Sequence, residues 1–251
     1  IPYLELFVKE SRTKTREDDF QLGYAYYKSN DPESAISYFK KTTYSNDSLA
    51  QVSNYLIAES YMDLDDKKAA RSAYQNVYNL GQNQELAEES LFNFAKLSYE
   101  LAYDPYNQAI DAFIMYLEKY PNAMRSEQAY EYLINIYLNS KNYRAAIGSL
   151  ESTMHLDNRF KKVYQQLVYN LGVEQFMNGD FYASIEVFDK SLTQPEDKSL
   201  AALASYWKAE AYYREKLYTQ AVSNYKEFIY HPRAILLPEF YLAHYGIAYS
   251  Y

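Results

Sequence analysis

Apolar and aromatic side chains recur at spacings of three and four residues along most of this chain, with polar side chains between them. This spacing places the apolar side chains on one face of an α-helix. Alternation typical of β-strands is absent outside these stretches. For the first pair we expect a helix over residues 16–29, a turn at Asn30-Asp31, and a second helix opened by Pro32. Proline suits the first turn of a helix, where its missing N–H costs little.

A small residue marks the same point of successive helical segments. It recurs at intervals of 35 to 39 residues, as Gly23, Ala58, Ala95, Gly172, Ala209 and Gly246, with Ile134 as the one bulky occupant. A fixed period of this size is typical of a repeat solenoid.

A second small residue follows the first after 12 positions in five repeats, as Ala35, Ala70, Ala146, Ser184 and Ala221. In the third repeat Ala109 follows after 14, which predicts two extra residues near residues 102–104. Four residues beyond each second marker stands a large side chain, as Phe39, Tyr74, Phe113, Leu150, Phe188 and Tyr225. We interpret this as helix pairs whose backbones approach at small residues while large side chains fill the space beside them.

These residues resemble the pattern of the tetratricopeptide repeat family. The first repeat matches with Leu22-Gly23, Tyr26, Ala35 and Phe39, and the resemblance covers residues 16–251. It implies an all-α fold, a right-handed α-solenoid of antiparallel helix pairs. It also implies a concave face that binds proteins or peptides.

The periodicity divides the chain into repeats that together form one continuous solenoid domain. Their predicted bounds are residues 16–50, 51–87, 88–126, 127–164, 165–201 and 202–238. We expect residues 1–15 to end a preceding helix and residues 239–251 to be the first helix of a truncated seventh repeat. The uncapped ends indicate a fragment of a longer array, because terminal repeats usually carry a polar cap.

In this family the first helix of each repeat lines the concave face. With the first small residue counted as position 8, positions 5, 9 and 12 would form the partner-binding groove. The resemblance implies that the groove contains Phe20, Tyr24, Tyr27, Tyr55, Glu59, Phe92, Tyr99, Glu131, Asn135, Tyr169, Phe176, Tyr206, Glu210 and Tyr213. Rigid aromatic side chains make good binding anchors, although the same rings could instead pack between helices. Because this face is acidic, we expect a ligand with apolar anchors and flanking Lys or Arg.

Charge and composition narrow the partner class. The net charge is −8, so the chain lacks the cationic surface that nucleic acid binding requires, and we expect no nucleic acid partner. No apolar run is long enough for a membrane span, so we expect no membrane insertion by this segment. The absence of Cys excludes disulfides, thiolate metal sites and Cys nucleophiles.

The chain carries no recognisable catalytic motif, and we predict no catalytic residue, cofactor or metal site. There is no Gly-rich phosphate loop, His-Glu-x-x-His or Gly-x-Ser-x-Gly. Asp63-Leu64-Asp65-Asp66 is similar to the start of a calcium loop but lacks its later Gly and Glu. We interpret it as a turn between two helices.

The leading hypothesis is therefore a non-enzymatic protein–protein interaction scaffold. Residues 113–137 show a weaker similarity to bacterial cell-envelope repeat proteins, namely outer-membrane assembly lipoproteins and the Tol-Pal coordinator. That similarity implies the periplasm or cell envelope of a Gram-negative bacterium and a role in envelope assembly. A glycan- or peptidoglycan-binding module that uses the tyrosines is the alternative, and a spacer segment is a third possibility.

Overall fold

The computed structural model describes residues 2, 6, 14–101, 106–153, 155, 157–193 and 195–251. Within these residues the secondary structure is helical and contains no strand, which confirms the predicted all-α fold. Two predictions from the sequence concern residues that the structure does not describe. Most of residues 1–15 and the expected insertion at residues 102–104 lie outside the described residues.

The chain divides into two compact units, residues 1–133 and 134–251. The first unit contains α2 (Arg16–Lys28), α3 (Pro32–Phe39), the 3-10 helix η1 (Lys40–Thr42), α4 (Ser48–Asp63), α5 (Lys67–Leu80), α6 (Gln84–Glu100) and α7 (Tyr106–Lys119). The division falls within α8 (Ser126–Leu138). The second unit continues with α9 (Tyr143–Thr153), α10 (Arg159–Met177), α11 (Phe181–Thr193), α12 (Lys198–Arg214), α13 (Tyr218–Tyr230), the 3-10 helix η2 (Ala234–Leu236) and α14 (Glu239–Ser250).

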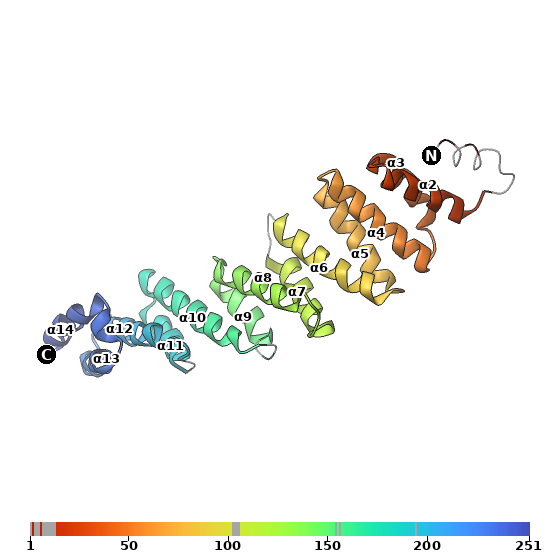
Figure 1. Ribbon diagram of the computed structural model, residues 1–251. Coiled ribbons are helices and arrows are strands. Elements are labelled where there is room, and N and C mark those ends of the chain that lie inside the picture. The colour runs from red at the N-terminus through yellow and green to blue at the C-terminus, as the bar shows by residue number, and fades with distance from the viewer. Residues whose placement is uncertain are drawn as a thin grey trace. The chain divides into compact units, whose positions relative to one another are not determined.

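From α2 to α7 in the first unit, and from α9 to α14 in the second, each helix packs against the next one along the chain, as for α4 with α5 and α10 with α11 (Figure 1). The first helices of neighbouring repeats also touch. In the first unit α4 contacts both α2 and α6, and in the second unit α12 contacts both α10 and α14. We call each of these sets of three helices a first-helix layer. Side chains on the first helices of different repeats therefore come together on one surface of each unit.

Four of the turns inside helix pairs share one backbone device. Asn30, Asp65 and Lys216 adopt positive φ angles of 59°, 55° and 60°, and Gly179 adopts 87°. The residue that follows Asn30, Asp31, accepts a hydrogen bond from Ser34 N at 3.1 Å and caps α3, with Pro32 directly inside the helix. The left-handed residue ends one helix and lets the capped helix start at once. This confirms the predicted helix, turn and Pro32 positions of the first repeat.

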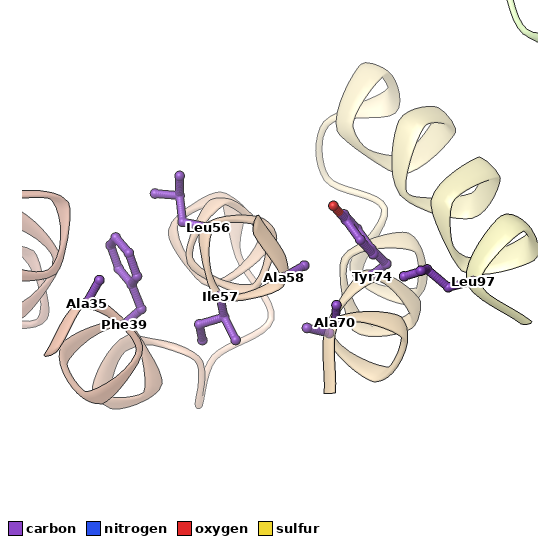
Figure 2. Packing of buried hydrophobic residues seen from close by; sticks show 9 residues of the cluster. Ala35, Phe39, Leu56, Ile57, Ala58, Ala70, Tyr74 and Leu97 are labelled. Atoms are coloured by element: carbon purple, nitrogen blue, oxygen red, sulfur yellow. The ribbon is translucent and has the colours of Figure 1, made fainter. Parts of the chain in front are cut away.

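The two small-residue markers lie where helices come closest. A Cβ atom added to Gly23 would lie 2.8 Å from Cδ1 of Phe39, and one added to Gly172 would lie 2.6 Å from Cε1 of Phe188. The buried cluster of the first unit runs from α3 to α6 and contains several of the marker residues (Figure 2). Ala35, Ala58 and Ala70 are fully buried in it. The rings thus occupy volume that a larger marker residue would need.

The repeat with the bulky marker differs at both positions. It carries Ile134 in place of Gly or Ala, and Leu150 is fully buried where the other repeats have an aromatic ring. A larger marker paired with a smaller filler keeps the total volume similar, which is the kind of exchange that helical cores tolerate.

Two buried glutamines join consecutive repeats by hydrogen bonds to the backbone. Gln51 Nε2 donates to the carbonyl oxygen of Asn83 at 3.1 Å, and Asn83 N donates to Gln51 Oε1 at 2.5 Å. Gln165 makes the equivalent pair with Asp197, at 3.0 and 2.6 Å. Asn83 and Asp197 are the N-caps of α6 and α12. Each glutamine therefore positions the start of the next first helix. The sequence analysis did not identify this contact.

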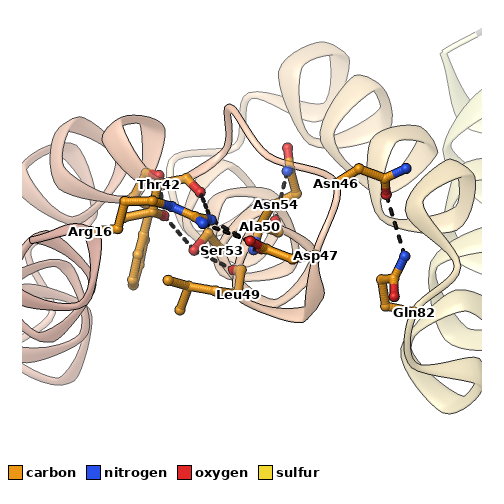
Figure 3. A network of polar contacts seen from close by, with 10 residues as sticks. Arg16, Thr42, Asn46, Asp47, Leu49, Ala50, Ser53, Asn54 and Gln82 are labelled. Atoms are coloured by element: carbon orange, nitrogen blue, oxygen red, sulfur yellow. Dashed lines mark hydrogen bonds and ion pairs between the residues drawn. The ribbon is translucent and has the colours of Figure 1, made fainter.

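Arg16 joins α2 to the start of α4 (Figure 3). Its Nη1 lies 2.6 Å from Asp47 Oδ2, and its Nη2 lies 3.0 Å from Asp47 Oδ1 and 2.7 Å from the carbonyl oxygen of Thr42. Asp47 also accepts from Ala50 N at 2.9 Å as the N-cap of α4. The hydrogen bond from Arg16, followed by that from Ala50, lowers the pKa of Asp47 from 3.8 to about 2.

The close approach at Gly172 predicts that Gly172→Ala destabilises the chain. Alanine favours a helix by ~0.5–1 kcal/mol over glycine, but overpacking costs typically ~1–3 kcal/mol. Gly148 in α9 is the matched control, because no atom lies within 4 Å of its added Cβ, and Gly148→Ala should stabilise. Urea unfolding measures both free energies. Adding Phe188→Leu should partly restore Gly172→Ala. Equal stabilisation by both alanines would contradict the packing argument.

The Arg16–Asp47 pair predicts a stability contribution that depends on pH. Because folding lowers the pKa of Asp47, the contribution is complete above about pH 4 and is lost as pH falls towards about 2. Asp47→Asn keeps an N-cap side chain and should remove this dependence. The free energies of unfolding of wild type and variant, measured from pH 7 to pH 2, should converge in that window. Parallel curves would show that the pair contributes no such dependence.

Candidate functional site

The first-helix layer of the first unit presents an aromatic surface on α2. Tyr24 is 40% exposed, and its ring centroid lies 6.3 Å from that of Phe20 and 6.5 Å from that of Tyr27. Lys28 Nζ lies 5.2 Å from the centroid of the Tyr24 ring and 5.7 Å from that of the Tyr27 ring. These three predicted groove residues are thus brought together, with a cation beside two of the rings.

Two carboxylates of α4 lie near Tyr27 and affect its ionisation. Burial raises the pKa of Tyr27, and the negative charges of Glu59 and Asp63 raise it further. Burial is also the main cause of the raised pKa of Tyr55, with added contributions from Glu59 and Glu89. We call Tyr24, Tyr27, Tyr55, Glu59 and Asp63 the tyrosine–acid surface. Its combination of rings and negative charge suits an apolar ligand that carries a positive charge.

The acids at position 9 also have partners inside the protein. The hydroxyl of the buried Tyr74 donates a hydrogen bond to Glu59 Oε1, and Tyr225 donates to Glu210 Oε1 at 2.6 Å. Burial, and then these acids, raise the pKa values of Tyr74 and Tyr225. In both units one carboxylate oxygen therefore satisfies a hydroxyl of the second helix. Glu59 and Glu210 have a structural role that the sequence analysis did not assign.

Several predicted anchors at positions 5 and 12 have little exposed surface. Phe92, Phe176 and Tyr206 are buried at 3%, 8% and 6% exposure. In Phe92 the ring contacts Phe113 of α7, with the centroids 6.2 Å apart, and Arg125 lies 5.5 Å from its centroid. These three rings pack between helices in this structure. They therefore correspond to the alternative stated in the sequence analysis, in which aromatic side chains at these positions belong to the core. The physical reason is that Phe92 and Tyr206 at position 5 face the large ring of the second helix, whereas Phe176 at position 12 packs against Phe181 and Trp207.

The remaining predicted residues vary in exposure. Tyr99 in the first unit and Tyr169 and Tyr213 in the second are half-buried. Glu131 and Asn135 on α8 are exposed, but the division between the units falls between them. The structure therefore does not assemble all the predicted residues into one described site, and their role in binding stays a prediction.

Trp207 is a central residue of the second unit that the sequence analysis did not single out. Its ring centroid lies 5.1 Å from that of Phe176 and 5.6 Å from that of Tyr206. Burial raises the pKa of Tyr169 to about 12, and a hydrogen bond with Trp207 opposes this increase. The chain's single Trp was a visible signal, because a Trp in a helical repeat fills an unusually large space.

The described ranges contain no group of three His, Asp or Glu side chains arranged to hold a metal ion. The acidic segment at residues 63–66 is a turn, as predicted, because Asp66 caps α5 by accepting from Ala69 N at 3.1 Å. None of the helices in the described part of the chain combines the length and the apolar composition needed to cross a membrane.

The Tyr74–Glu59 bond predicts a measurable stability effect. Glu59→Ala leaves a buried hydroxyl without its acceptor, which should cost ~1–3 kcal/mol in the free energy of unfolding. Tyr74→Phe should cost less, and the double variant should cost less than the sum of the two. Alanine at the exposed Glu174 of α10 is the control and should change stability by less than ~0.5 kcal/mol. Additive effects of Glu59→Ala and Tyr74→Phe would show that the two residues are not coupled.

Two family models match parts of the chain. The model described as anaphase-promoting complex, cyclosome, subunit 3 matches residues 1–77, and a tetratricopeptide repeat model matches residues 169–234. No curated protein matches the chain.

Solved structures of repeat proteins are also similar. A tetratricopeptide repeat protein from Parabacteroides merdae is 16% identical, with a TM-score of 0.43 over 99% of this chain and 90% of that one. The TPR2AB domain of yeast Sti1, solved as a complex with pHSP90, is 12% identical, with a TM-score of 0.37 over 93% and 98%. The P58(IPK) TPR domain is 15% identical, with a TM-score of 0.41, and the match covers 94% of this chain and 64% of that chain.

Proposed function

We propose that this chain, which is a tetratricopeptide repeat protein, is a non-enzymatic scaffold that binds a peptide or protein partner through the first-helix faces of its repeats. The observation that carries the proposal is the tyrosine–acid surface of the first unit. There Tyr24 is 40% exposed beside Tyr27, which in turn lies near Glu59, whereas Phe92, Phe176 and Tyr206 are buried. Solvated rings on a rigid helical layer are suited to anchor a ligand at low entropic cost.

The charge of this surface supports a partner with positive charge. Glu59 and Asp63 lie close enough to Tyr27 to raise the pKa of its hydroxyl, and their effect is larger than the opposing effect of Lys28. A partner segment with an aromatic or aliphatic anchor and a neighbouring Lys or Arg would bring opposite charges together. Nucleic acid is disfavoured by the same charge, because its phosphates would face these carboxylates.

A screen of a random peptide library with the whole chain tests the proposal. Peptides bound by wild type should be enriched in apolar residues beside Lys or Arg, and Tyr24→Ser combined with Tyr27→Ser should weaken their binding by roughly tenfold or more. The matched controls are Tyr182→Ser and Tyr230→Ser on the second helices α11 and α13, where the rings are 61% and 82% exposed. These controls should bind like wild type.

Equal binding by the α2 variant and the controls would contradict the proposal, provided that circular dichroism shows the same helix content. The same proteins can be applied to a glycan array. Glycan binding that depends on Tyr24 and Tyr27, without peptide binding, would support the glycan-binding alternative instead. No binding to either array by wild type would favour the spacer interpretation.

We also propose, separately from the scaffold function, that the protein acts in the bacterial cell envelope. It is supported by the similarity of residues 113–137 to envelope repeat proteins, and it implies a periplasmic address. Fractionation of the source cells with an antibody against this chain tests it, and recovery in the cytoplasmic fraction would refute it without affecting the scaffold proposal.

A further inference from the structure

A pocket between α8 and α10 combines an aliphatic floor with two cationic side chains. Its volume is about 280 Å³, and its lining consists of Ile134, Leu138, Arg159, Lys162, Val163 and Gln166. All six residues belong to the second unit. An apolar cavity of about 150 Å³ accepts benzene. The pocket therefore has room for a large aliphatic or aromatic side chain.

The apolar floor depends on the one repeat that departs from the small-residue pattern. Ala58, Ala95 and Ala209 at the equivalent position are fully buried, whereas Ile134 is half-buried. Leu138 stands one helical turn later on the same face and is 43% exposed. The bulky marker thus adds an open aliphatic surface to α8 that the other repeats do not have at this position. The packing of the helix pair does not account for the exposed part of that surface.

The two cations that line the pocket, Arg159 and Lys162, lie in the first turn of α10. Arg159, Lys161 and Lys162 lie there with no acidic residue, and the N-cap Asn158 makes no side-chain hydrogen bond to the helix. Positive charge at a helix N-terminus opposes the helix dipole, so this arrangement does not favour the helix itself. The local charge at this helix start is positive, which is opposite in sign to the net charge of −8 of the whole chain.

The nearby acids offset this charge only in part. Asp157 holds Arg159 through both carboxylate oxygens, with Nε 3.0 Å from Oδ1 and Nη2 2.9 Å from Oδ2, and it also accepts a hydrogen bond from Arg159 N at 2.7 Å. Lys162 Nζ lies 4.0 Å from Asp197, and its side chain is 69% exposed. Asp197 also accepts hydrogen bonds from Ser199 N and Leu200 N at the start of α12. Lys162 therefore remains available to a carboxylate at the mouth of the pocket.

We propose that this pocket binds a large apolar side chain from an acidic segment of a protein partner, with Lys162 facing the carboxylates beside that side chain. The proposal rests on the scaffold function, since it names the chemistry of a partner segment at the first helices of the second unit. It differs from the tyrosine–acid surface of the first unit, which favours positive charge. The aliphatic residues supply affinity, and Lys162 selects the sign of the flanking charge.

Fluorescence anisotropy with a labelled peptide tests the pocket in the whole chain. The probe is acetyl-Asp-Glu-Asp-Phe-Glu-Asp-Glu-amide, whose blocked ends leave only side-chain carboxylates. Lys162→Glu should weaken binding roughly tenfold, because it places like charges together, and Leu138→Ser should weaken it by a similar factor. Lys161→Glu is the matched control: it makes the same charge change on the same helix, at a residue that does not line the pocket. It should have a much smaller effect.

Several results would overturn the proposal. These are no saturable binding of the probe by wild type, equal losses for Lys161→Glu and Lys162→Glu, or undiminished binding of a probe with Ser in place of Phe. Binding only of a probe with a free terminal carboxylate, or only of phosphatidylglycerol vesicles, would assign the pocket to another ligand class. Library peptides that depend on Tyr24 and Tyr27 while the acidic probe fails to bind would leave the scaffold function standing without this pocket. Circular dichroism of each variant verifies the fold.

Discussion

The contact between a residue without a bulky side chain and a large ring on the partner helix is the interaction on which the repeat structure depends. At Gly23 and Gly172 the ring of the second helix occupies the space where a Cβ atom would be. A helix pair buries little apolar surface alone, so a close approach is needed to exclude water from between its helices. Repetition of this contact then lets each pair pack against the next, and buried clusters form between successive helices of each unit.

Hydrogen bonds to backbone groups add direction to this packing. Hydrophobic contact is non-directional and would allow neighbouring repeats to slide. Gln51 and Gln165 exchange two hydrogen bonds with the backbone of a helix-capping residue, and this geometry is met at a single alignment of the repeats. Arg16 performs a similar task between α2 and α4 through both oxygens of Asp47. The first helices are thereby aligned, and their side chains form a continuous surface within each unit.

The two proposed binding surfaces consist of side chains that this packing leaves exposed. Where the ring at position 5 is drawn into the core, as at Phe92 and Tyr206, the surface loses an anchor. On α2, Tyr24 is 40% exposed, and the ring of the partly buried Tyr27 lies next to it. Where Ile134 replaces a small marker, an aliphatic patch opens next to the cations of α10. One fold thus presents two surfaces of opposite charge, each within its own unit.

The sequence by itself determined the all-α fold, the helix pairing and the turn positions, because these depend on contacts at regular spacings along the chain. The small markers, the large residue four positions after each second marker, and Asn30, Asp31 and Pro32 are local signals of that kind. Only the tertiary structure decided which aromatic residues are buried, that Glu59 and Glu210 accept hydrogen bonds from tyrosines of the second helix, and that Ile134 lines a pocket with Lys162. These properties depend on how close two helix faces come and on which side chain fills the space between them. A position on one helix does not contain that information, since the same ring can face solvent or a neighbouring helix with only a small change in packing.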